Sequence, residues 1–253
     1  MQRLARTLAA VALAATAVAA QAASVKVTFD SPIFDGTPAP YYDAVRITFP
    51  TLAGTGSESL DVAAGRFHGS ASNVVGIEPG RFVDNVNSLW MYCYDLYETI
   101  GNGSVVTYNV NFAGATDRTL AFLGAVNAVR NSGAATPDPY AWLHPSTAYE
   151  AAAIQLGIWE SKYDSGWNID SGAFSASGIE SATRSALAGY FAALATAAPL
   201  DRSYTMVLEA RGAQDMITGD PPGTVPEPGT LSLLLAPLAL LALGRRRSGA
   251  RVG

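Results

Sequence analysis

Ser146-Thr-Ala-Tyr-Glu-Ala-Ala-Ala-Ile-Gln-Leu-Gly-Ile-Trp-Glu160 is the stretch at which this 253-residue chain changes character. Thr147, followed three residues later by Glu150, forms a capping box, which predicts that a helix starts at Ala148. The apolar residues of the stretch recur at helical spacing and form one face: Ala151, Ile154, Ile158 and Trp159. The pattern therefore predicts a buried helix in the second half of the chain.

The segments before this helix alternate apolar and polar residues, which is typical of half-buried strands. Such strands are predicted over 24–29, 41–49 and 105–112. An aromatic-rich segment, 88–96, predicts a more deeply buried strand. Between 51 and 80, recurring Gly and Ser residues indicate loops and short strands.

Two more helices and a last strand complete the prediction. A short helix is expected over 121–129, and a longer one over 179–197 with Ser177 and Glu180 as its capping box. A strand is expected over 204–210. This order predicts the α+β class: a mainly antiparallel β body, sandwich or barrel-like, with helices inserted in its second half.

Both ends of the chain have the composition of targeting segments. Residues 1–22 contain two arginines, an apolar run and an Ala-x-Ala site, the three parts of a secretory signal peptide. Residues 220–229 form a Pro-rich linker, and 230–253 hold an apolar run, predicted as a transmembrane helix, with arginines after it. Residues 23–219 are thus expected to form one globular domain.

The C-terminal tail resembles the PEP-CTERM sorting signal, through Pro226, Glu227 and Pro228, the apolar run and the basic end. This resemblance implies recognition and cleavage by an exosortase-type membrane enzyme in a Gram-negative bacterium that makes exopolysaccharide. It also implies membrane attachment through the tail before cleavage. The expected location is then the cell envelope, the cell surface or the extracellular matrix.

Charge and motifs exclude several classes of function. The chain carries 16 Lys and Arg against 21 Asp and Glu, and six of the arginines lie in the two terminal segments. So acidic a body is a poor partner for nucleic acid. The sequence contains no nucleophile elbow, no P-loop and no metal-spaced His/Cys cluster. We therefore expect no cofactor, no metal and no enzymatic turnover.

Cys93 and Gln155 are the residues to which we assign chemistry. Each alone fits ordinary burial, since a free cysteine packs as a small hydrophobe and a buried amide can bond a loop backbone. Together, a buried thiol and carboxamide can condense: the sulfur attacks the amide carbon, ammonia leaves, and a thioester joins the side chains. The thioester then stores an activated acyl group.

Met91-Tyr-Cys-Tyr-Asp95 and Ile154-Gln-Leu-Gly-Ile-Trp159 resemble the two motifs of the internal-thioester domains of bacterial surface adhesins. The resemblance spans roughly residues 85 to 215. It implies a Cys93–Gln155 cross-link that couples the protein covalently to an amine or hydroxyl on a surface protein or polysaccharide. The family usually has Thr and Ala where this chain has Ile154 and Gly157, and neither change removes a reacting atom.

A stored thioester must be shielded from water and from the chain's own amines. Tyr92, Tyr94 and Trp159 are the predicted walls of a supporting pocket, with Trp90 beside them. The chain has only two lysines, and Lys162 lies seven residues after Gln155, on nearly the same helix face. We expect Lys162 to point away if the helix ends before it.

Two other functions are compatible with the sequence. In one, the protein is a non-reactive structural component of the envelope or exopolysaccharide matrix, and Cys93 and Gln155 are merely buried. In the other, it is a carbohydrate-binding β domain that uses exposed aromatic side chains such as Trp142 and Trp167.

Overall fold

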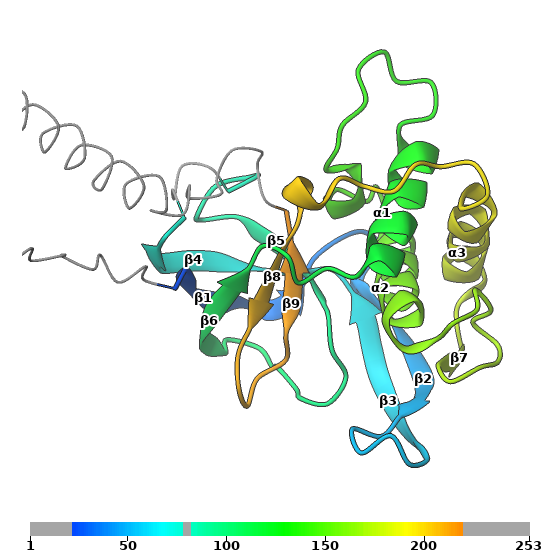
Figure 1. Cartoon of the computed structure of the whole chain (residues 1–253), viewed down its shortest axis with the longest axis horizontal. Helices are drawn as coiled ribbons and strands as arrows, with labels where there is room; N and C mark the ends of the chain where they lie inside the picture. The colour runs from blue at the N-terminus through cyan, green and yellow to red at the C-terminus, as the bar shows by residue number, and fades with distance from the viewer. Residues whose placement is uncertain (1–21, 78–81, 220–253) are drawn as a thin grey trace, which may run out of the picture. The chain divides into compact units, whose positions relative to one another are not determined.

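The computed structural model describes residues 22–77 and 82–219 (Figure 1). Residues 1–21 of the predicted signal peptide, the linker with Pro226–Pro228 and the predicted transmembrane tail lie outside the described residues. None of the described helices is long and apolar enough to cross a membrane. In chain order the elements are β1 (Ser24–Phe34), β2 (Tyr42–Pro50), β3 (Ser57–Gly65), β4 (Phe67–Val75), β5 (Leu89–Cys93), β6 (Val105–Asn111), α1 (Asp117–Arg130), η2 (Ala141–Leu143), α2 (Ala148–Tyr163), β7 (Ser175–Ser177), α3 (Ser181–Ala193), η3 (Arg202–Tyr204), β8 (Met206–Glu209) and β9 (Met216–Thr218).

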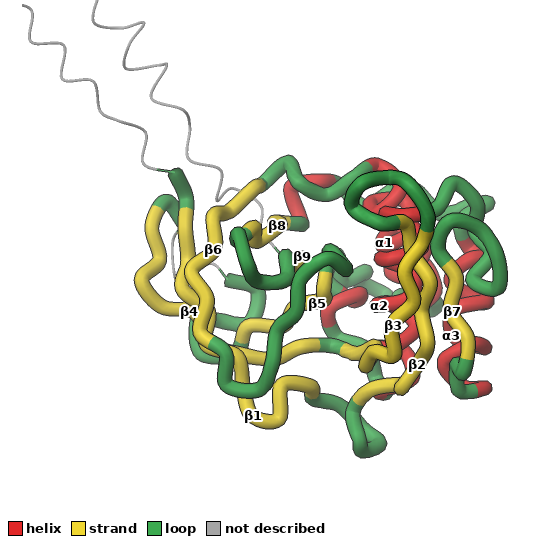
Figure 2. Tube along the Cα trace, turned by 90° about the horizontal axis from the view of Figure 1, so that it is seen from below, coloured by secondary structure: helices red, strands yellow, loops and turns green. Residues whose placement is uncertain are grey.

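Six strands close into an antiparallel barrel in the order β1-β4-β5-β9-β8-β6, and a smaller antiparallel sheet has the order β3-β2-β7. Helix α2 packs against β2 and β3, and the three helices pack against one another. Figure 2 shows the barrel strands on one side and the small sheet with its helices on the other. The predicted α+β class is confirmed, and the barrel is the architecture found.

Arg66 joins the barrel to the rest of the body. It is the one residue between β3 of the small sheet and β4 of the barrel, and it is buried. Its Nη1 donates to the carbonyl of Leu143 at 2.7 Å, and its guanidinium carbon lies 3.6 Å from the ring centre of Trp90. The chain therefore passes from one sheet to the other at a point held by a buried cation.

Helix α2 begins at Ala148, as the capping pattern predicts. The N–H of Glu150 donates to the hydroxyl of Thr147 at 3.1 Å. The helix continues to Tyr163, three residues beyond the predicted helical stretch, which ended at Glu160. Every residue from 151 to 161 is buried, because the small sheet covers one side of the helix while α1 and α3 pack against it as well.

Several predicted boundaries are wrong. Helix α1 starts at Asp117 and not at 121, because the hydroxyl of Thr116 accepts the N–H of Thr119 and caps the helix. The Ser177–Glu180 capping box does not form, since Ser177 pairs with β2 as part of β7. The region between 51 and 80, predicted as loops and short strands, forms the nine-residue strands β3 and β4.

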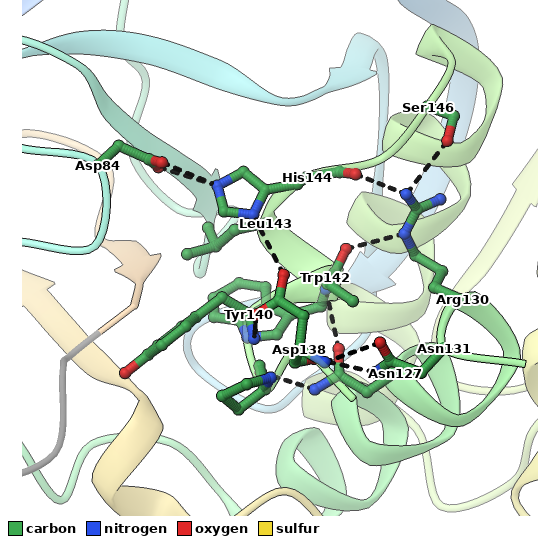
Figure 3. Close-up of polar contacts among 12 residues, drawn as sticks. Asp84, Asn127, Arg130, Asn131, Asp138, Tyr140, Trp142, Leu143, His144 and Ser146 are labelled. Carbon is green, nitrogen blue, oxygen red and sulfur yellow. Dashed lines mark hydrogen bonds and ion pairs between the residues drawn. The ribbon is translucent and has the colours of Figure 1, made fainter. Parts of the chain in front are cut away.

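Arg130, the last residue of α1, organises the loop that leads into α2 (Figure 3). Its side chain donates to the carbonyls of Ala141 and His144 at 2.8 and 2.5 Å, and it pairs with Glu150 in the first turn of α2. His144 in turn lies 3.0 Å from Asp84. These bonds fix where α2 begins and thus where its side chains lie.

Candidate functional site

Strand β5 and helix α2 bring Cys93 and Gln155 into contact. Cys93 is the last residue of β5, where it pairs with Met216 of β9, and Gln155 lies in the middle of α2. Both residues are fully buried. The N–H of Cys93 donates to Oε1 of Gln155 at 2.8 Å, and Nε2 of Gln155 donates to the carbonyl of Cys93 at 2.8 Å. The carboxamide is thus held by both backbone groups of the cysteine.

These two bonds orient the carboxamide of Gln155 and polarise it. A backbone N–H aimed at the carbonyl oxygen stabilises the negative charge that develops there when a nucleophile attacks the carbon. The second bond holds the amide nitrogen, which would be the leaving group. Chemically, the arrangement suits attack on the side-chain carbon of Gln155.

The thiol of Cys93 is also held in place. Its Sγ donates to the carbonyl of Asp95 at 2.7 Å. Burial, followed by the charge of Asp95, raises the pKa of the Cys93 thiol well above its ordinary value. The indole Nε1 of Trp159 makes no hydrogen bond of normal geometry among the described residues. Its interaction with the sulfur nevertheless lowers the pKa of the Cys93 thiol and so partly opposes the effect of burial. The thiol is therefore protonated at neutral pH.

A pocket of about 220 Å³ is lined in part by Cys93. It lies where barrel strands β1, β4 and β5 meet β3 and α2, and its walls are mostly apolar. Glu98, Thr99 and Gln214 provide its polar lining. The apolar lining residues are Ile33, Phe34, Leu60, Val62, Ala63, Phe67, Leu96, Ile100 and Trp159.

The predicted aromatic residues take different positions around Cys93. Trp159 lines the pocket together with the cysteine. Tyr94 donates its hydroxyl to the carbonyl of Gly114 at 3.3 Å, near the start of α1. Tyr92 is fully buried, and its hydroxyl donates to the carbonyl of Trp142 at 3.2 Å.

Lys162 does not meet the condition under which it would point away, because α2 continues through it. Its Nζ lies 4.0 Å from the ring centre of Tyr94. Burial lowers the pKa of the Lys162 ammonium, while Asp95 and Asp215 oppose that effect. The amine thus belongs to the surroundings of Cys93.

Sequence reasoning missed an acidic group beside the cysteine. Carboxylate oxygens of Asp95, Glu98 and Asp215 lie within 4.8 Å of one another. Burial, followed by the charge of Asp215, raises the pKa of Asp95 to about 7. Because Lys162 supplies a positive charge next to these carboxylates, we assign no metal ion to them. Asp95 belongs to the quoted cysteine motif, whereas Asp215 reaches it only through the pairing of β5 with β9.

The aromatic residues proposed for carbohydrate binding are less exposed to solvent than expected. Trp142 is fully buried, so the prediction that it is exposed is wrong. Trp167 is partly buried, stacks on Phe122 and carries the guanidinium of Arg118 at 4.1 Å from its ring centre.

Comparison with protein-family models, with curated proteins and with solved structures finds no match.

Proposed function

We propose that the body of this protein forms an internal thioester between Cys93 and Gln155 and uses it to attach covalently to an amine or hydroxyl on a surface protein or polysaccharide. The observation that carries the proposal is the pair of 2.8 Å hydrogen bonds between the Gln155 carboxamide and the backbone of Cys93, a residue that also lines a pocket. An ordinary buried glutamine needs a partner, but it does not need a thiol and a pocket beside it.

The reaction is a balanced exchange of one bond for another. The Cys93 sulfur bonds to the side-chain carbon of Gln155, the carbon–nitrogen bond breaks, and the thiol proton leaves with the nitrogen as ammonia. When an acceptor amine attacks later, the carbon–sulfur bond breaks and the thiol is regenerated. Each molecule reacts once, so the protein is not an enzyme in this proposal.

We further propose that the chain is exported and sorted, on the basis of its two terminal segments. Residues 1–22 would direct export, and an exosortase-type enzyme would act at Pro226–Pro228 while 230–253 anchor the chain. The body would then lie in the envelope, on the cell surface or in the matrix. N-terminal sequencing of the mature protein should begin at Ala23, and a mature chain that starts at Met1 would contradict the export proposal.

Intact mass tests the thioester directly. Protein made without reducing agent should weigh one ammonia less than its calculated mass, and it should show no free thiol. Methylamine should then add one equivalent, at Gln155, and release the thiol of Cys93. Cys93→Ala provides the matched control, because it should have its full calculated mass and form no adduct.

A full calculated mass with a free thiol from the outset would rule out the thioester. The protein would then be a non-reactive structural component of the envelope or matrix, in which the Gln155 bonds serve only to satisfy buried polar groups. Quenching of tryptophan fluorescence by polysaccharide would instead favour the carbohydrate-binding function.

A further inference from the structure

Thioester formation at this site requires a proton to move from the thiol of Cys93 to the amide nitrogen of Gln155. The thiol of Cys93 is fully buried, its proton is donated to the carbonyl of Asp95, and burial keeps it protonated. A protonated thiol is a poor nucleophile, and an amide nitrogen leaves only when it gains a proton. A group that takes the proton from sulfur and delivers it to nitrogen would meet both requirements.

Asp95 carries the carboxyl that interacts electrostatically with the Cys93 thiol. Its residue is buried, and its Oδ1 has no hydrogen-bond partner among the described residues. Its own carbonyl accepts the bonds of the Cys93 thiol at 2.7 Å and of Gln214 Nε2 at 3.2 Å, so the backbone that carries the carboxyl is fixed against the cysteine. A buried carboxylate oxygen without a hydrogen-bond partner disfavours the charged form of the carboxyl, although the interaction of Asp95 with the backbone of Asp215 opposes this in part.

Burial and the charges around Asp95 bring the pKa of its carboxyl to about 7. Asp215 and Glu98 face it with negative charge, and the ammonium of Lys162 faces it from α2 with positive charge. Asp215 is itself fixed, since its carbonyl accepts the N–H of Tyr94 at 2.7 Å and its Oδ1 accepts the N–H of Ala210 at 3.1 Å. The carboxyl can therefore gain and lose a proton near neutral pH.

We propose that Asp95, with Asp215 beside it, carries the thiol proton of Cys93 to the departing amide nitrogen of Gln155 when the thioester forms. The carboxylate takes the proton as the sulfur–carbon bond forms. It gives the same proton to the nitrogen as the carbon–nitrogen bond breaks, and ammonia leaves. Asp95 ends in its starting state, and no proton is gained or lost overall. This inference rests on the proposed thioester.

The test measures re-formation of the thioester in the folded protein. Ammonia reverses the reaction and restores the thiol of Cys93 and the carboxamide of Gln155. After ammonia is removed, the loss of one ammonia from the intact mass is followed over time between pH 5 and 9. In the wild type the rate should rise with pH through about 7, where the Asp95 carboxylate forms.

Asp95→Asn should slow re-formation by about tenfold or more and abolish the inflection near neutral pH. Glu98→Gln removes a charge from the same group of carboxylates and should move the inflection to lower pH. Asp170→Asn is the matched control, because it removes an exposed carboxylate that pairs with Arg184. It should leave both the rate and the inflection unchanged. Asp215→Asn should also move the inflection to lower pH, which keeps the proposal testable if circular dichroism shows that Asp95→Asn is unfolded.

The outcomes separate the two proposals. If the wild type re-forms the thioester and Asp95→Asn does so at the same rate with the same inflection, Asp95 is not the proton carrier, although the thioester proposal stands. An unmoved inflection in Asp215→Asn would also overturn the role of Asp95. A wild type that never loses ammonia removes the thioester proposal itself.

Discussion

Gly157 lies against the ring of Phe122, so that a Cβ at position 157 would lie 1.9 Å from Cζ of the phenylalanine. Real carbon atoms do not approach so closely, so only glycine fits on this face of α2. Phe122 belongs to α1 and is fully buried. The glycine that departs from the usual thioester motif is therefore explained by the close packing of α1 against α2, two residues from Gln155.

Gly157→Ala should destabilise the body by roughly 2 kcal/mol or more, because overpacking outweighs the gain in helix propensity. Gly189→Ala in α3 is the matched control, because nothing lies within 4 Å of the added methyl group. That control should stabilise the body by about 0.5–1 kcal/mol. Urea unfolding measures both, and equal effects from the two variants would contradict the packing argument.

Gln155→Ala should destabilise the body more than Cys93→Ala does. Both variants lack the proposed cross-link, but only the first leaves the backbone N–H and carbonyl of Cys93 buried and unpaired. Each of the two unpaired groups costs about 1–3 kcal/mol, so we expect a difference of roughly 2–6 kcal/mol in the free energy of unfolding. Equal stabilities would mean that water or another group replaces the carboxamide.

Leu60→Trp should slow methylamine addition without preventing thioester formation. Leu60 lines the same pocket as Cys93, and the residue is 41% exposed, so a larger residue can fill the pocket without disturbing the core. The missing ammonia should persist in the intact mass while the adduct forms more slowly. Leu52→Trp, at a site 79% exposed and outside the pocket, should react like the wild type. An unchanged adduct rate in Leu60→Trp would mean that amines enter by another path.

Glu160 should make the body less stable as the pH rises. Its Oε1 accepts the N–H of Asn168 at 2.8 Å, its Oε2 is buried without a partner among the described residues, and burial raises the pKa of its carboxyl from 4.5 to about 7. The folded state favours the protonated form. The stabilisation is therefore complete below pH 4.5 and is lost as the pH rises through about 7.

Glu160→Gln removes this dependence. The variant should match the wild type near pH 4.5 and exceed its stability by roughly 1–3 kcal/mol at pH 8. Urea unfolding at the two pH values measures the effect, and Glu58→Gln on the exposed part of β3 is the control. The raised pKa of Asp95 acts in the same direction, so a weaker slope should persist in Glu160→Gln. A wild type whose stability does not fall between these pH values would contradict the burial argument.

Local patterns predicted the parts of the fold that depend on nearby residues. The alternation at 24–29 predicted β1, whose Val25, Val27 and Phe29 face the core, and Thr147 predicted the start of α2. The elements that failed depend on partners far away in the chain. Ser177 joins β2 at Arg46, and β9 is only three residues long and exists because β5 and β8 flank it.

The candidate site also has one part that the local sequence predicts and one part that depends on residues far apart in the chain. The single cysteine and the glutamine on an apolar helix face can be found in the sequence, and the structure places them in contact. The group of carboxylates cannot be found so, because Asp215 lies far from Asp95 in sequence and meets it only when the barrel closes. Exposure of Trp142 was predicted wrongly, because a loop residue can still be enclosed when its loop is held down, here by Asn127 and Arg130.

The pairing of β5 with β9 also sets an order of events during folding. Strand β5 remains an open edge until Met216–Thr218, the last strand in the described part of the chain, arrives beside Tyr92 and Cys93. A thioester formed as proposed would have its complete surroundings only after nearly the whole body has folded. In that proposal the short final strand would act as a timing element, which keeps an incompletely folded body from spending its single reactive bond.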